Sequence, residues 1–133
     1  NSWTSTNCAV IVNRTLGTQA MCWMSGGSLR RAGVNVYTTI YRGASHNLGR
    51  STGALEGGGA DSPGSGLQKF SEDYIPHAIC TMDADLTISG STTYTVYVKN
   101  SGSATWEINH NSWSGRMTLL VMEIKGSGTV ATP

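Results

Sequence analysis

The sequence has little charge. Only 13% of its residues are charged, and the formal net charge is +1 at pH 7. The longest basic run is the pair Arg30-Arg31. Nucleic acids and anionic membranes attract proteins through clusters of lysine and arginine. The composition therefore predicts neither a nucleic-acid partner nor membrane insertion.

Paired cysteines are also missing. Cys8, Cys22 and Cys80 are an odd number at wide spacing and include no CxxC pair, which argues against a disulfide framework. Each cysteine lies in an apolar, strand-like stretch, so we expect buried free thiols. Free thiols indicate a chain that folds in a reducing cytoplasm.

Long apolar runs and helical patterns are absent as well. No stretch has the length and apolarity of a transmembrane helix, and no signal peptide is visible. Helical periodicity extends over about two turns at most. Short apolar runs instead alternate with turns rich in Ser, Asn and Gly, and 17 residues are Gly. This pattern predicts an all-β protein, an antiparallel β-sandwich of the jelly-roll type with about seven to nine short strands.

The 133 residues fit a single domain. We expect residues 1–7 to be a polar lead-in and residues 127–133 to be a tail. Because the chain begins at Asn1 without an initiator Met, we expect a fragment of a longer protein. Ser25–Ser28 (SGGS) predicts a turn, His77–Met82 a buried strand, and Leu67–Ile75 a short strand or a helical turn. Arg42–Gly66 is Gly- and Ser-rich and predicts a long surface loop, with one short strand near Leu48–Ala54.

Catalytic motifs are weak. Gly49–Gly53 matches GxSxG, but that motif needs a preceding strand and a following helix, and here it lies in a Gly-rich loop. Asp83–Asp85 has DxD spacing without the Gly and Glu of a calcium loop, so a turn at a strand end explains it. The histidines are isolated in sequence: His46, His77 and His110. We therefore expect no enzyme, no metal site and no cofactor.

The C-terminal region predicts three consecutive strands joined by short turns, a β-meander over Tyr94–Lys99, Trp106–Asn109 and Met117–Ile124. The last strand is apolar on both faces, with Met117, Leu119 and Val121 opposite Leu120, Met122 and Ile124. A strand of this kind is typically covered on both sides. We expect it in the centre of a sheet or against a second copy of the chain.

Aromatic and amide side chains are the candidate binding groups, since exposed rings stack on sugars and anchor protein contacts. Trp106 shares a face with Ile108 and is expected in the core. Trp113 lies in the turn NHNSWSG and is the first candidate for an exposed anchor or an intersubunit contact. We expect recognition by the loops Gly43–Gly66 and Asn109–Gly115. The full candidate set is Trp113, Tyr97, Tyr41, His46, Asn47, Asn109, His110 and Asn111.

The C-terminal quarter resembles a known family. Thr93–Val96 (TYTV) is followed by Glu107–Asn109 (EIN), a Ser-Gly-Arg turn and Met117–Gly126 (MTLLVMEIKG), and Asp61–Ser65 (DSPGS) precedes them. This order is similar to the terminal domain of bacteriophage tail fibres and related phage structural proteins. The turn before the last strand departs from the family pattern, because Gly115 precedes Arg116 here.

The resemblance implies a β-sandwich knob, similar in plan to tumour-necrosis-factor-like trimers, at the tip of a homotrimeric fibre. It implies a virion protein, made in the host cytoplasm, that binds a host-surface glycan or protein. Two alternatives remain open. One is a trimerisation, capping or capsid decoration domain without a receptor. The other is a carbohydrate-binding module of a secreted protein, for which paired cysteines or a calcium loop are typical.

Overall fold

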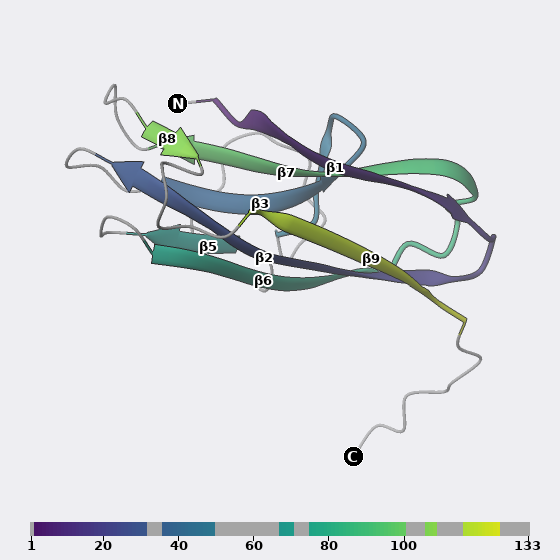
Figure 1. Ribbon diagram of the computed structural model, residues 1–133. Helices are drawn as coiled ribbons and strands as arrows, with labels where there is room; N and C mark the ends of the chain where they lie inside the picture. Colours follow the sequence, from purple (N-terminus) through teal and green to yellow (C-terminus); the bar gives the residue numbers. More distant parts are fainter. Residues whose placement is uncertain are drawn as a thin grey trace, which may run out of the picture.

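Residues 2–31, 36–49, 67–70, 75–100, 106–108 and 116–125 are described by a computed structural model. These residues form nine strands in two antiparallel sheets, and they include no helix. Figure 1 shows β1, β7 and β3 in one layer and β2, β6 and β9 in the other. The predicted all-β, antiparallel architecture is confirmed, and its two layers are those of a β-sandwich.

The first sheet has the order β1-β7-β3-β4, and β5 also pairs with β3. The strand β3 lies between β7 on one side and the short strands β4 and β5 on the other. The strands have these bounds: β1 Thr4–Arg14, β7 Gly90–Asn100, β3 Val36–Arg42, β4 His46–Asn47 and β5 Leu67–Phe70.

The second sheet is built around β2 (Gln19–Arg31), the longest strand. On one side β2 pairs with β6 (Ile75–Asp83). On its other side, β9 (Thr118–Ile124) pairs with the first half of β2 and β8 (Trp106–Ile108) with the second half.

The core lies between the two sheets. Every second side chain of a strand points inward, so β2 contributes Cys22 and Met24 while Trp23 between them points outward. The opposing sheet contributes Ile40 from β3, with Tyr94 and Val96 from β7, all 0% exposed. Burial of each such side chain contributes about 1.5–3 kcal/mol.

The expected C-terminal meander is wrong. β7 pairs with β1 and β3, whereas β8 and β9 both pair with β2 in the other sheet. The chain thus passes from one layer to the other after β7. Alternation in a sequence identifies strands, but their partners depend on the tertiary packing of both sheets.

The last strand is not central among the described strands either, because β9 pairs with β2 alone. Its inner residues Leu119 and Val121 pack against the core, while Leu120 and Met122 are 51% and 47% exposed. The second apolar face of β9 therefore remains open to solvent.

The turn expected at Ser25–Ser28 is wrong, because β2 runs through it. Gly26 has φ +78°, and the register of β2 against β6 shifts between Gly26 and Ser28. A positive φ is accessible to glycine at little cost, and the result is a β-bulge rather than a reversal. The expected lead-in is also partly wrong, since β1 begins at Thr4.

The strand His77–Met82 is half-buried rather than buried. Ile79 and Thr81 point inward, while Cys80 and Met82 are exposed. All three cysteines are free as expected, but Cys22 alone is fully buried. The strand expected within Leu67–Ile75 is confirmed as β5. Leu48 and Gly49 lie in a turn after the two-residue strand β4, and the rest of the strand expected near Leu48–Ala54 lies outside the described residues.

Candidate functional site

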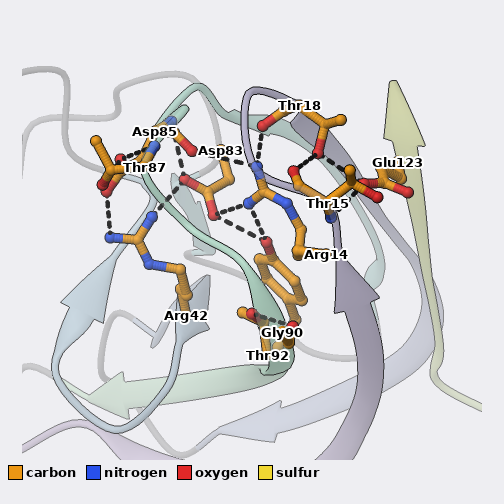
Figure 2. A network of polar contacts seen from close by, with 11 residues as sticks. Arg14, Thr15, Thr18, Arg42, Asp83, Asp85, Thr87, Gly90, Thr92 and Glu123 are labelled. Carbon is orange, nitrogen blue, oxygen red and sulfur yellow. Dashed lines mark hydrogen bonds and ion pairs between the residues drawn. The ribbon is translucent and has the colours of Figure 1, made fainter. Parts of the chain in front are cut away.

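A charged cluster joins the two sheets at one end of the sandwich (Figure 2). It consists of Arg14 at the end of β1, Arg42 at the end of β3, Asp83 at the end of β6, and Asp85 just beyond it. Two guanidinium groups thus face two carboxylates, and Tyr94 of β7 lies among them. The side chains of Arg14 and Asp83 are 0% and 1% exposed.

Asp83 is the centre of this cluster. Its Oδ2 accepts hydrogen bonds from Arg14 Nη1 at 2.9 Å and from the Tyr94 hydroxyl at 2.8 Å. Its Oδ1 accepts one from Arg42 Nη1 at 2.8 Å. Burial, followed by the hydrogen bond to Asp83, raises the pKa of the Tyr94 phenol, which therefore stays a neutral donor.

The remaining contacts of the cluster reach neighbouring loops. Arg14 Nη2 donates to the carbonyl oxygens of Thr18 and Asp85. Arg42 Nη2 lies 3.0 Å from Asp85 Oδ2. Because Arg14 and Asp83 are buried, loss of either side chain would leave the other with an uncompensated charge inside the protein.

Glu123 makes a second polar link, from β9 to the turn between β1 and β2 (Figure 2). Its Oε1 accepts hydrogen bonds from the backbone N–H of Thr15 at 2.6 Å and from Thr18 Oγ1 at 2.7 Å. The bond from Thr18, followed by that from Thr15, lowers the pKa of the Glu123 carboxyl. Hydrogen bonds from Thr87, followed by the charge of Arg42, lower the pKa of Asp85.

These carboxyl groups make stability depend on pH. A carboxyl whose pKa is lower in the folded chain contributes stability above its unfolded pKa of about 4, and this contribution is lost as the pH falls. We expect Glu123→Gln to be less stable than the wild type at neutral pH. The difference, measured by urea unfolding, should shrink as the pH falls below about 4. A difference that stays constant would show that the ionised carboxylate of Glu123 contributes nothing.

An aromatic cluster, which we call the tyrosine face, lies on the side of the first sheet that points away from the core, where Tyr41 and Tyr37 are 0% and 6% exposed and the other members are half-buried. It comprises Trp3, Tyr37, Tyr41, Tyr97 and Lys99. The rings of Tyr41 and Tyr97 lie 4.2 Å apart with an interplanar angle of 31°, and Trp3 lies 6.1 Å from Tyr41. Lys99 Nζ lies 5.3 Å from the centroid of the Trp3 ring and 5.6 Å from that of Tyr37. Alternation of β3 and β7 produces this face, since the residues between these positions point into the core.

Asn47 of β4 borders the tyrosine face, opposite Tyr41 in the ladder. Its Oδ1 accepts hydrogen bonds from Thr39 Oγ1 at 2.7 Å and from the backbone N–H of Gly49 at 2.9 Å. These contacts fix the orientation of the amide. Within the described part of the chain, Asn47 Nδ2 and the Tyr41 hydroxyl are both buried and have no hydrogen-bond partner.

Four of the predicted site residues come together here. The rings of Tyr41 and Tyr97 are in tilted contact, Asn47 lies opposite Tyr41, and His46 lies opposite Arg42 in the same short ladder. Tyr41 is 0% exposed, so the half-buried ring of Tyr97 is the part of this pair that solvent reaches. The other candidates lie outside the described residues: Trp113, Asn109, His110 and Asn111.

Trp3, Tyr37 and Lys99 are the members of the tyrosine face that are not in the predicted candidate set. The signal for Lys99 was present, because it shares a strand face with Tyr97 and Thr95. Trp3 gave none, since it precedes the first recognisable strand. The side chain of Trp106, which was expected in the core, is not among those described. Residues 50–53 of the GxSxG match also lie outside the described residues.

Among the described residues, no group of three or more His, Cys, Asp or Glu side chains is placed to hold a metal ion. The same ranges contain no helix long and apolar enough to cross a membrane. A scan of protein-family models, a search of curated proteins and a search of solved structures each found no match.

Proposed function

We propose that this chain is an attachment module of a virion fibre or spike that binds a host-surface glycan through the tyrosine face. The observation that carries the proposal is the close contact between the rings of Tyr41 and Tyr97, flanked by Trp3 and Lys99 on one side of the first sheet. The phage setting follows from the resemblance of the C-terminal strands to tail-fibre terminal domains. The same resemblance is the basis for proposing a homotrimeric knob of the jelly-roll type that is located in the virion.

The physical basis is a rigid aromatic platform. Tyr97 is half-buried and contacts the fully buried ring of Tyr41, so binding immobilises little further side-chain freedom. The flat ring of a tyrosine provides apolar area for the C–H side of a sugar, and its hydroxyl provides a polar contact. The ammonium of Lys99 lies over the rings of Trp3 and Tyr37 and adds a positive charge beside the platform.

The test is binding of the chain to an array of bacterial envelope polysaccharides. We expect binding to a subset of glycans, and we expect Tyr97→Ala to weaken it at least about tenfold, as for an aromatic anchor. Leu16→Ala is the control, because Leu16 is a 68% exposed side chain in the turn between β1 and β2. Equal binding by wild type and Tyr97→Ala would remove the tyrosine face from the proposal.

A purely structural module, which caps or assembles a virion component without a receptor, is the second candidate. The apolar outer surface of the second sheet favours it, since such a surface is typical of protein contacts. Absence of glycan binding together with stable self-association would select this alternative.

A further inference from the structure

The outer surface of the second sheet is apolar where β6, β2 and β9 lie side by side. The register of the ladders places six outward side chains in two rows across these strands. We call them the methionine face: Cys80, Trp23 and Leu120 in one row, and Met82, Met21 and Met122 in the next.

The most exposed members of this face are large. Trp23 and Leu120 are 51% exposed, Met122 is 47% exposed and Met82 is 41% exposed. With roughly 200 Å² available on each free side chain, these four present about 400 Å² of contiguous apolar surface. The other large exposed apolar residues of the described chain lie outside this face: Ile11 on β1, and Leu16 and Leu86 in two turns joined by a hydrogen bond from the backbone N–H of Gly17 to the carbonyl oxygen of Leu86.

The face carries no charge. None of its six positions is Asp, Glu, Lys, Arg or His, and the next row across the sheet is Ala78, Ser25 and Thr118. This apolar centre and its uncharged neighbouring row offer a charged partner no opposite charge to pair with. It matches a surface of its own kind, and Trp and Met are enriched at such contacts.

We infer that the methionine face is where a second copy of this chain docks. Two copies that each contribute about 400 Å² of apolar area, together with the polar rim, bury on the order of 1,000 Å², which a specific interface requires. Sheets pack well face to face, and a surface that is complementary to itself closes about a twofold axis. In a trimer with threefold symmetry, these side chains would instead be covered by a different surface of the neighbouring copy.

The inference adds an association surface to the proposed function and does not require glycan binding. The tyrosine face and the methionine face lie on the outer surfaces of different sheets. A substitution in the tyrosine face therefore leaves the methionine face intact, and the reverse. Loss of glycan binding and loss of self-association can thus be measured separately.

The experiment is the solution mass of the chain by light scattering over a wide range of protein concentration. We expect two or three times 14.0 kDa for the wild type. Trp23→Lys and Met122→Lys, on neighbouring strands, are expected to raise the dissociation constant of the assembly at least about thirtyfold. Ile11→Lys is the matched control, since it places the same charge on a 68% exposed isoleucine of β1.

Circular dichroism of each variant checks that it remains folded, and Met122→Lys serves if Trp23→Lys unfolds. A wild type that stays at 14.0 kDa at all concentrations overturns the inference. An assembly that the two lysine variants and Ile11→Lys leave equally intact overturns it as well, because the copies then associate elsewhere.

Discussion

Asp83→Ala is expected to lower the free energy of unfolding by about 3–5 kcal/mol, the usual cost of removing one partner from a buried ion pair. Asp83 receives hydrogen bonds from Arg14, Arg42 and Tyr94, and the Arg14 side chain is 0% exposed. Without this carboxylate the guanidinium of Arg14 stays buried and loses its only close anion among the described residues. That uncompensated charge is the source of the loss.

Urea unfolding at neutral pH measures the effect. Asp85→Ala is the matched comparison, because the Asp85 carboxylate pairs with Arg42 in the same cluster but is 34% exposed. Exposed ion pairs contribute little, so this replacement should cost at most about 1 kcal/mol. A loss from Asp83→Ala no larger than that from Asp85→Ala would contradict the role assigned to the cluster.

A double variant separates the buried charge from the lost contacts. Arg14→Met with Asp83→Leu removes both charges together, so it should cost much less than the sum of the two single replacements. Additive losses would mean that the two side chains stabilise the fold independently of each other.

Ile40→Ala is expected to lower the free energy of unfolding by about 2–5 kcal/mol, through lost burial and the cavity left behind. Ile40 is 0% exposed in the central strand β3 and belongs to the core cluster between the sheets. Its neighbours come from both layers, so they cannot close the space without moving a whole sheet.

Ile11→Ala gives the comparison for the same chemical change. Ile11 is 68% exposed on β1, so its truncation should cost less than about 0.5 kcal/mol in the same urea assay. Similar losses at the two positions would mean that the two sheets do not enclose the core described above.

The strands themselves were largely predictable, because alternation of apolar and polar residues is local. Alternation identifies the stretch that forms β7, and a continuous apolar run identifies the stretch that forms β9. Which strands pair with each other was not predictable in the same way. The pattern of Met117–Ile124, apolar on both faces, indicates a covered strand, whereas β9 pairs with β2 alone and exposes Leu120 and Met122. Gly26 predicts a turn, yet its positive φ accommodates a bulge within β2.

The tyrosine face was partly predictable from the same alternation, which places Tyr97 and Lys99 on one face of their strand. The contact between Tyr97 and Tyr41 depends on the pairing of β3 with β7, which no local pattern encodes. The charged cluster was not predictable at all. Arg14 and Asp83 are 69 positions apart, and the sequence around Asp83 indicates only a turn at a strand end. Long-range ion pairs of this kind follow from the topology and not from spacing.

The measurement that tests glycan attachment most directly is binding of the fluorescently labelled chain to whole bacteria from a panel of strains. The account predicts labelling of a subset of strains. This labelling should be lost after periodate oxidation of cell-surface sugars and retained after protease treatment of the cells. Tyr97→Ala should abolish it, and Leu16→Ala should not. Labelling that survives periodate and disappears with protease, or no labelling of any strain, would contradict the account.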